Sequence, residues 1–336
     1  MKYTLRWLLG LLVFLTVVYL LGPAPPKPQL EATLPPVTSF LATLEREIAA
    51  SEGLQPGLKP NNQARIVWMD STRKQKTPYS MLYLHGFSAS QEEGAPVHRN
   101  LARRFGCNLY LARLEDHGTE RPDVFLKLTP ENLWASARRA YAIAAQLGDS
   151  VIVIGTSNGG ALGLLLASTQ SRIAALVVYS PAVALYNPAA VLLDKPWGLQ
   201  IARIVTGSDY AENGQAKGAI RQYWTTKYRL EGLVALQSFL DRTMNSETFS
   251  RIYCPVFLAY YYKNDTAQDK VVSVPAMREM FKALGTPSAQ KRERAFPYVA
   301  EHVIASHLRS KDWQSVERET VRFLEEVARL KAANGR

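Results

Sequence analysis

One apolar segment that runs into a serine between glycines constrains the fold of this chain more than any other feature. Residues 151–154 read Val-Ile-Val-Ile, a β-branched run typical of a strand buried on both faces. The pentapeptide Gly155-Thr156-Ser157-Asn158-Gly159 follows, and residues 160–167 are then apolar and typical of a helix. Glycines two positions before and after Ser157 permit a sharp strand-to-helix turn with a strained serine and an exposed hydroxyl. The sequence therefore predicts a strand, this turn and a helix, and a purely structural turn serine is the alternative.

Apolar segments alternate with longer amphipathic ones along most of the chain. The 336 residues, 47% of them hydrophobic, suffice for one large core. Helices are expected from Thr129, a cap followed by a proline, through residue 147, and over residues 312–330. Strands are expected at residues 65–69, 81–84, 109–112, 151–154, 175–179, 256–261 and 292–296. The sequence therefore predicts an α/β fold, with a mostly parallel sheet covered by helices.

Residues 181–250 interrupt this alternation. They contain helical patterns at 197–204, 218–229 and 232–244 but no convincing strand. An insertion that follows a strand end lies where an open α/β sheet places its ligand crevice, so we expect a helical cap over a binding site. Its aromatic side chains either face a ligand or only pack within the cap, and packing is favoured for most of them. These aromatic residues are Trp197, Tyr223, Trp224 and Tyr228.

The N-terminus has the pattern of a targeting segment. Lys2 and Arg6 precede an uncharged apolar run, and a stretch rich in proline follows it. Residues 1–22 are therefore expected to be a signal anchor or a signal peptide, followed by a proline-rich spacer and entry segment at 23–60. Pro25 disfavours cleavage beside it, so the anchor is preferred. The basic flank then predicts a membrane-anchored protein whose main domain lies on the non-cytoplasmic side, periplasmic or extracellular, or is secreted if cleavage occurs.

Composition excludes several classes of site and partner. Forty Lys and Arg against 29 Asp and Glu give a formal net charge of +11, which could suit an anionic surface or nucleic acid. No recognisable nucleic-acid-binding motif accompanies this charge, so we expect no nucleic-acid partner. Cys107 and Cys254 lie far apart in the sequence, which excludes a CxxC redox motif and a Cys-rich zinc site. Both are expected to be buried as small apolar side chains, and no metal site is predicted.

The residues downstream of Ser157 offer two candidate bases. A serine hydroxyl is a weak nucleophile that needs a base and an orienting carboxylate within hydrogen-bond reach. In enzymes built around such a turn, the acid and then the histidine follow the serine along the chain, and only His302 and His307 do so here. His302 comes soon after the last expected strand, where a loop can carry it over the carboxyl edge of the sheet, and is preferred. His307 stays open as the alternative, although the spacing of five residues argues against a zinc pair.

Two carboxylates follow the expected strand at 256–261 and compete for the role of the acid. Asp269 is followed by Lys-Val-Val-Ser, like the D-x-V-V-P/S pattern that commonly carries this residue. Asp265 lies in Lys-Asn-Asp-Thr, a sequence typical of a turn. Asp269 is therefore preferred and Asp265 remains the alternative. For each of them, the alternative to a catalytic role is an ordinary surface carboxylate.

An acyl-transfer site also needs hydrogen-bond donors where the carbonyl oxygen becomes negative. The loop after the strand at 81–84 reads His85-Gly86-Phe87-Ser88. The backbone N–H groups of Phe87 and Asn158 are the expected donors, because one comes from this loop and the other from the residue after the nucleophile. His85 is then expected to be a structural residue of the loop and not a second base.

These motifs together resemble the α/β-hydrolase superfamily, and most of all its carboxylesterase and monoacylglycerol-lipase-like branch. The resemblance extends from about residue 65 to residue 330. Residues 112–118 resemble the P-R-L-x-G-H-G segment of that branch but depart from it at Ala112 and Asp116. The residues that carry the resemblance, in chain order, are 84–88, 112–118, 155–159, Asp269 and His302.

The resemblance implies a fold and its division along the chain. The fold is a mostly parallel eight-stranded sheet with flanking helices, and the cap is inserted after the sixth strand. Residues 61–180 and 251–336 then form the hydrolase core, and residues 181–250 form the helical cap.

The resemblance also implies a serine hydrolase that cleaves carboxylic esters, either acyl esters or lipid-like substrates, through an acyl-enzyme intermediate. Ser157 is then the nucleophile, His302 the base and Asp269 the acid, and no metal or organic cofactor takes part. The expected partners are a small-molecule ester and, through the N-terminal segment, a membrane; the oligomeric state stays open. Two alternatives use the same fold: a serine hydrolase that cleaves amides or peptides, and a catalytically silent, membrane-tethered binding protein.

Overall fold

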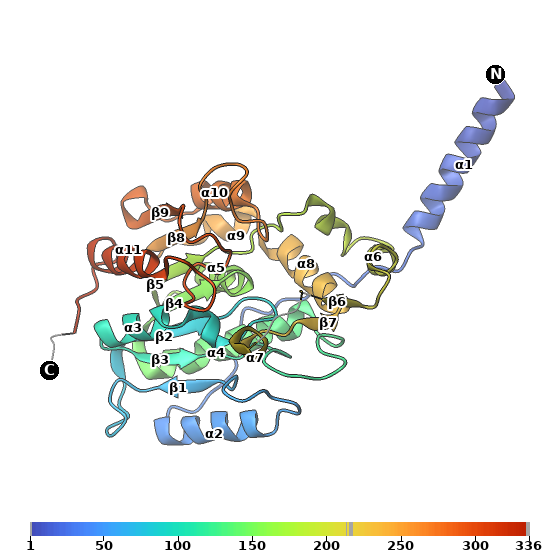
Figure 1. The fold of residues 1–336 in the computed structure, drawn as a ribbon. Coiled ribbons are helices and arrows are strands. Elements are labelled where there is room, and N and C mark those ends of the chain that lie inside the picture. The colour runs from blue at the N-terminus through green and yellow to red at the C-terminus, as the bar shows by residue number, and fades with distance from the viewer. Residues whose placement is uncertain (1, 213, 215–217, 334–336) are drawn as a thin grey trace.

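A central sheet of seven strands organises the protein, and Figure 1 shows helices on both of its faces. The computed structural model describes residues 2–212, 214 and 218–333. The strands are β1 (Arg65–Val67), β2 (Thr77–Leu84), β3 (Asn108–Leu111), β4 (Gly148–Thr156), β5 (Ile173–Tyr179), β8 (Val256–Tyr261) and β9 (Lys291–Phe296). Their order is β1-β3-β2-β4-β5-β8-β9, and every neighbouring pair is parallel except β1 and β3. The predicted α/β fold with a mostly parallel sheet is confirmed.

The sheet has seven strands in the described part of the chain, and not the eight that the family resemblance implied. The residues ahead of β1 include a helix, α2 (Leu41–Gly53), in place of a further strand. Leu41, Leu44 and Ile48 recur at helical spacing, so one face of α2 is apolar and packs against the core. The chain therefore enters the sheet at its antiparallel edge strand, β1.

Alternating side chains of the central strands divide the core into two layers. In β4, Val151 and Val153 belong to one layer, and Ile152 and Ile154 belong to the other. The first layer contains residues of α2, α4 (Pro130–Leu147), α5 (Asn158–Thr169), α8 (Glu231–Thr243) and α10 (Val274–Ala283). The second contains residues of α3 (Val97–Arg104) and α11 (Trp313–Glu326), and a short helical turn, η3 (Ser288–Gln290), precedes β9. β4 is the fourth of the seven strands in the sheet order, so its carboxyl end lies near the middle of the sheet edge.

Residues 181–250 are mostly helical and also contain a small sheet. The segment comprises η2 (Pro188–Leu192), α6 (Gly198–Thr206), β6 (Tyr210–Glu212), α7 (Gly218–Tyr223), β7 (Lys227–Arg229), α8 and α9 (Ser246–Ser250). The expectation of no strand here is wrong, because β6 and β7 pair antiparallel. Strands of three residues are too short to show an alternating pattern in the sequence. The division of the chain into a core and a cap stays a prediction.

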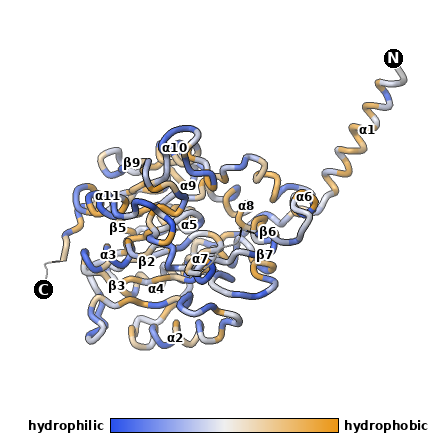
Figure 2. Tube along the Cα trace, in the orientation of Figure 1, coloured by the Kyte–Doolittle hydropathy of each residue, from blue (hydrophilic) through white to orange (hydrophobic). Residues whose placement is uncertain are grey.

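The N-terminal helix α1 (Lys2–Leu20) extends away from the rest of the protein (Figure 1) and is apolar over most of its length (Figure 2). The predicted membrane anchor is nevertheless wrong: within the described residues, no helix combines the length and the apolar character that crossing a bilayer requires. The uncharged run at 7–21 is about 22 Å long as a helix, against a hydrocarbon core of about 30 Å. The predicted membrane partner and the predicted location on the non-cytoplasmic side, or outside the cell, depended on this segment and are corrected with it.

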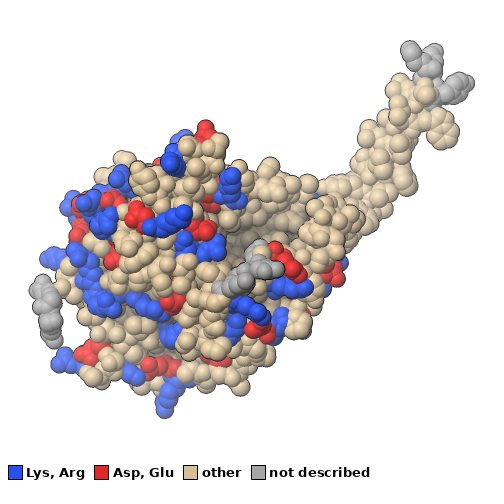
Figure 3. Space-filling model, viewed as in Figure 1, with Lys and Arg blue, Asp and Glu red and all other residues tan. Residues whose placement is uncertain are grey.

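Charges of both signs lie together on the drawn face of the protein, and its two thiols lie apart in the sequence. Figure 3 shows Lys and Arg mixed with Asp and Glu over the face that it draws. Cys107 is buried and Cys254 is half-buried, and neither forms a disulfide. Burial raises the pKa of each thiol to about 12, so both stay protonated at neutral pH. The prediction that both cysteines are buried is therefore correct for Cys107 and wrong for Cys254, which is only partly buried.

Candidate active site

The predicted strand-to-helix turn around Ser157 is present at the carboxyl end of β4. Ser157 lies between β4 and α5 with φ 53° and ψ −119°, a strained conformation for a residue with a side chain. A Cβ on Gly155 would overlap the backbone of Gly159, and a Cβ on Gly159 would overlap the backbone of β2, so both positions exclude larger residues. Ser157 N–H donates to Tyr179 O (2.9 Å), and Ser157 O accepts from Ala182 N–H (2.9 Å). These bonds fix the turn at the N-terminus of α5.

A cavity of about 630 Å³ opens beside this turn. Ser157, Phe87 and His302 line it, although they come from three distant parts of the chain. Asp269 lies behind His302, and Asn158 is fully buried at the start of α5. Many other lining side chains are apolar and belong to residues 181–250. They include Leu185, Ile220, Trp224, Tyr228, Leu233 and Leu236.

A buried hydrogen bond joins His302 to Asp269. His302 Nδ1 is 2.6 Å from Asp269 Oδ2, and the N–H groups of Val271 and Val272 donate to Asp269 Oδ1 at 2.8 and 3.1 Å. Burial alone would raise the pKa of Asp269, but the charge of His302 and these hydrogen bonds hold it below its ordinary value. Burial alone would lower the pKa of His302, and Asp269 raises it above its ordinary value. The ionised Asp269 thus favours a proton on Nδ1, which leaves Nε2 as the basic nitrogen.

The alternative acid and base lie outside the cavity. Asp265 is exposed and accepts a hydrogen bond from a neighbouring tyrosine (2.8 Å). His307 is exposed, and its Nδ1 is 2.9 Å from Ala95 O. Within the described residues no hydrogen bond joins the side chains of Ser157 and His302, although both line one cavity. Such bonds are often long or misaligned when no substrate is bound.

Two hydrogen bonds fix the imidazole of His85 in the loop after β2. Leu114 N–H donates to His85 Nε2 (3.1 Å), so Nδ1 carries the proton and donates to Gly86 O (2.9 Å). Burial lowers the pKa of His85 to about 4, so the ring is neutral at pH 7. His85 thereby holds the peptide group that contains Gly86 O and Phe87 N–H. This is the structural role that the sequence predicted for it.

Both predicted oxyanion donors have an N–H group without a backbone partner. Phe87 N–H makes no hydrogen bond in the part of the chain that the structure describes. Asn158 is the first residue of α5, and a helix offers its first N–H groups no internal acceptor. Both groups are therefore available to an acceptor that binds beside Ser157.

Glu93 is a buried carboxylate in this cavity that the sequence did not single out. It lies in η1 (Gln91–Gly94), and its Oε2 accepts hydrogen bonds from Gly86 N–H (2.5 Å) and Tyr83 OH (3.2 Å). Burial raises the pKa of Glu93 to about 7, although the bond from Gly86 and the charge of His302 act in the opposite direction. No spacing in the sequence links Glu93 to the other candidate residues, so only the fold reveals it.

Asp116 departs from the pattern of the related branch because it occupies a glycine position. Its φ is 61°, in the left-handed region that favours glycine. Its carboxylate accepts hydrogen bonds from Phe125 N–H (2.6 Å) and from Arg121. Aspartate tolerates this conformation better than most residues and here supplies two local bonds, so the departure preserves the turn.

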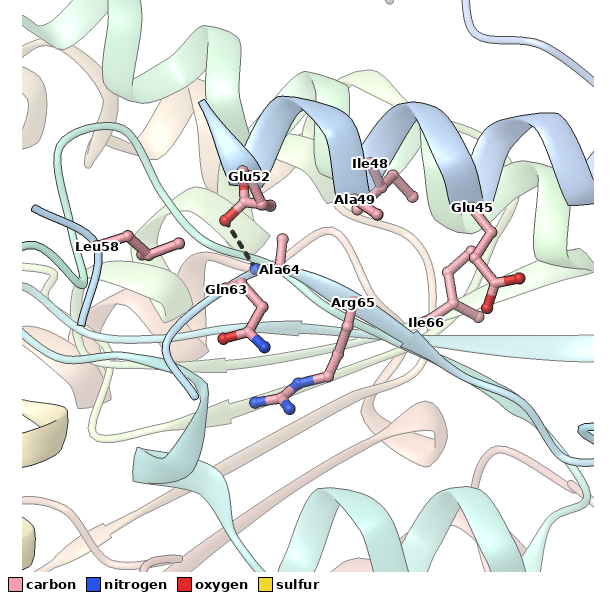
Figure 4. Close-up of a pocket in the computed structure, with 10 residues that line it drawn as sticks. Glu45, Ile48, Ala49, Glu52, Leu58, Gln63, Ala64, Arg65 and Ile66 are labelled. Atoms are coloured by element: carbon pink, nitrogen blue, oxygen red, sulfur yellow. Dashed lines mark hydrogen bonds between the residues drawn. The ribbon is translucent and has the colours of Figure 1, made fainter. Parts of the chain in front are cut away.

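A second cavity, of about 450 Å³, lies between α2 and β1 (Figure 4). Figure 4 shows Glu52 bonded to Ala64 N–H, at 3.0 Å. Glu52 also pairs with Arg113 at 2.6 Å, so its carboxylate already has partners. None of the predicted site residues lines this cavity. The cavity beside Ser157 is therefore the candidate active site.

A family model matches the whole stretch of the chain that lines this cavity. The model of the alpha/beta hydrolase family matches residues 81–310, which run from β2 past His302. The chain belongs to the α/β-hydrolase family. The resemblance seen in the sequence motifs is thereby confirmed.

A lipase is among the relatives of this α/β hydrolase, and lipolytic enzymes share its fold. It is 32% identical over 107 residues to the thermostable monoacylglycerol lipase of Bacillus sp. (strain H-257), a match that spans 32% of this chain and 42% of the lipase. A structure of the metagenome-derived lipolytic enzymes LipS and LipT has a TM-score of 0.63 at 17% identity, covering 80% of this chain and 99% of that one. A soluble variant of monoglyceride lipase from Saccharomyces cerevisiae has a TM-score of 0.57 at 14% identity, covering 78% and 91%. At these identities the two structures share the fold.

Proposed function

We propose that this α/β hydrolase cleaves carboxylic esters, with Ser157 as nucleophile, His302 as base and Asp269 as the acid that orients it. One observation carries the proposal: His302, which forms a buried hydrogen bond with Asp269, lines the same cavity as a serine held in a strained strand-to-helix turn. This combination supports an activated serine; the proposal requires in addition that His302 approaches the Ser157 hydroxyl when substrate binds, as catalytic hydrogen bonds often tighten only then. The similarity to a monoacylglycerol lipase supports the same chemistry.

In the proposed reaction, Ser157 Oγ attacks the ester carbonyl carbon while His302 Nε2 takes the hydroxyl proton. The carbonyl oxygen becomes negative and binds the N–H groups of Phe87 and Asn158, and each such donor lowers the barrier by about 3 kcal/mol. Collapse of this intermediate expels the alcohol, which receives the proton from His302, and leaves an ester on Ser157. Water, deprotonated by His302, then hydrolyses that ester and releases the acid.

The lining of the cavity supports an acyl or lipid-like substrate. Its apolar side chains from residues 181–250 would remove a hydrocarbon chain from water, which is worth about 0.8 kcal/mol for each buried methylene group. The cavity volume of about 630 Å³ lies within the range of small-molecule sites. In this proposal, residues 181–250 form the wall that receives the acyl chain.

A fluorophosphonate probe and a panel of p-nitrophenyl esters test the proposal. The probe should label Ser157, and Ser157→Ala should lose the label and about six orders of magnitude in kcat. Ser168→Ala is the matched control, because Ser168 lies on α5 and bonds only Leu165 O. Labelling of another residue, or full esterase activity in Ser157→Ala, would contradict the assignment. Faster cleavage of aminoacyl-anilides than of esters would favour the amide alternative.

A further inference from the structure

Glu93 occupies a position in the candidate active site that the proposed reaction does not use. Its side chain lines the cavity with Ser157 and His302, and the residue is only 2% exposed. A Cβ placed on Gly86 would lie 2.7 Å from Glu93 Oε1 and 3.1 Å from Ser157 Cβ. The carboxylate and the nucleophile therefore both pack against the same glycine.

Gly86 is held through both of its backbone polar groups. Glu93 Oε2 accepts its N–H at 2.5 Å, and His85 Nδ1 donates to its carbonyl oxygen at 2.9 Å. That carbonyl shares a rigid peptide plane with Phe87 N–H, the proposed oxyanion donor. Losing the bond to Glu93 would remove one of the restraints on Gly86, which has no side chain to limit its rotation, and so loosen the orientation of the Phe87 N–H group.

Charged and titratable groups from two parts of the fold face Glu93. Tyr83 of β2 donates its hydroxyl to Oε2 (3.2 Å) and also bonds the hydroxyl of Thr156, the residue before the nucleophile (3.1 Å). His302 and Arg309 both come from the segment after β9 and interact electrostatically with Glu93. Arg309 is paired with Glu301 at 2.9 Å, whereas the imidazole of His302 is hydrogen-bonded to Asp269.

We propose that Glu93 is a positioning residue of this hydrolase: its carboxylate orients the loop that carries Phe87 N–H and places a second negative charge beside His302. The inference rests on the proposed function of Ser157 and His302. Glu93 forms no bond to the substrate and exchanges no proton with it. Its effect reaches the reaction through the oxyanion donor and through the basicity of His302.

The charge of Glu93 also acts on the imidazole. Burial alone would lower the pKa of His302, and the negative groups Asp269, Glu93 and Glu301 raise it. Removing the charge of Glu93 should therefore lower the pKa of His302. Since the proposed base must be neutral to accept a proton, the acid limb of the kcat/KM profile should then move to lower pH.

Glu93→Gln tests the proposal because it removes the charge and keeps an oxygen that can accept from Gly86 N–H. We expect kcat to fall about tenfold, less than for loss of a whole oxyanion donor, with little change in KM. The acid limb of the pH profile should shift downward. Glu92→Gln is the matched control: it makes the same chemical change one residue away, where Glu92 pairs with Arg99 (3.0 Å) and does not line the cavity.

The outcomes separate this inference from the proposed function. If the wild-type protein is labelled at Ser157 but Glu93→Gln matches it in kcat and in pH profile, the positioning role is wrong and the proposed function stands. If the wild-type protein is not labelled at Ser157, the proposed function itself fails.

A second variant decides the question if Glu93→Gln does not fold. Tyr83→Phe keeps the buried ring and removes one donor to Glu93 Oε2, so Glu93 should carry less negative charge at a given pH. A smaller downward shift of the acid limb supports the proposal. An unchanged limb in folded Tyr83→Phe overturns it.

Discussion

The two carboxyl groups near the His302 imidazole, those of Asp269 and Glu93, have pKa values shifted in opposite directions. The pKa of Asp269 lies below its ordinary value because the charge of His302 and three hydrogen bonds outweigh the effect of burial. Burial dominates at Glu93 and raises its pKa to about 7. Asp269 therefore stays ionised at every pH where the enzyme would work, whereas Glu93 changes charge near neutrality. Environments that separate the pKa values of paired acids in this way are typical of active sites.

Asp269→Asn should abolish most of the activity without unfolding the protein. An amide at this position no longer stabilises the imidazolium and favours the wrong tautomer of His302, so kcat should fall by about 10⁴. Asp265→Asn is the matched control, because Asp265 is exposed and lies four residues earlier in the same loop. Ester hydrolysis by the two purified variants measures the difference. Equal losses in both, or activity retained in Asp269→Asn, would remove Asp269 from the proposed mechanism.

At the scale of elements, those with their own local signals could be predicted from the sequence. Thr129 and the following proline predicted the start of α4, and the helix indeed runs over Pro130–Leu147. The helix expected at 312–330 begins after its Asp312 cap but ends at Glu326, because no sequence signal marks its end. The three-residue strands β6 and β7 could not be predicted, since their pairing with each other and not their composition defines them.

The residues of the candidate site also differ in whether a local sequence signal marks them. Ser157 is marked by its own neighbours, and the strand before Asp269 and the strand before His302 placed these two residues near one sheet edge. Glu93 has no such local mark. It reaches the site because η1 folds back on Gly86 after a turn of the loop, and only the packed structure contains that contact.

Thr129→Ala tests the contribution of the α4 cap to stability. Thr129 accepts from Asn132 N–H (3.2 Å), and the Asn132 side chain accepts from Thr129 N–H (2.8 Å), which together form a capping box. Losing the first of these bonds should lower the free energy of unfolding by about 1 kcal/mol in urea titrations. Thr169→Ala at the end of α5 is the control, because its hydroxyl bonds carbonyls of its own helix and the side chain of the next residue but caps no helix N-terminus. A loss as large in Thr169→Ala would mean that the cap has no special role.

At the scale of the whole molecule, buried neutral histidines link the packing to pH. Burial lowers the pKa of His85 to about 4 and of His98 to about 3, and that of His117 well below its ordinary value. Below pH 6.5, each of these histidines binds fewer protons in the folded protein than in the unfolded chain. Each therefore lowers the free energy of unfolding as the pH falls from 6.5 toward its folded pKa. Glu93 acts oppositely, because its raised pKa adds stability as the pH falls from about 7 to 4.5. Among these fully buried groups, three histidines against one carboxyl predict a net loss as the pH falls from 6.5 to 4.5.

The free energy of unfolding in urea should therefore fall steadily between pH 6.5 and pH 4.5. His98 supplies the clearest test, because its Nε2 bonds Gln91 O (2.8 Å) and its buried Nδ1 has no partner among the described residues. His98→Asn should flatten the dependence of stability on pH by the share of one histidine, whatever its effect on stability at pH 7. Ser168→Ala, which removes no titratable group, should leave the slope as it is in the wild-type protein. If both variants keep the wild-type slope, protonation of buried histidine is not what weakens the fold in acid.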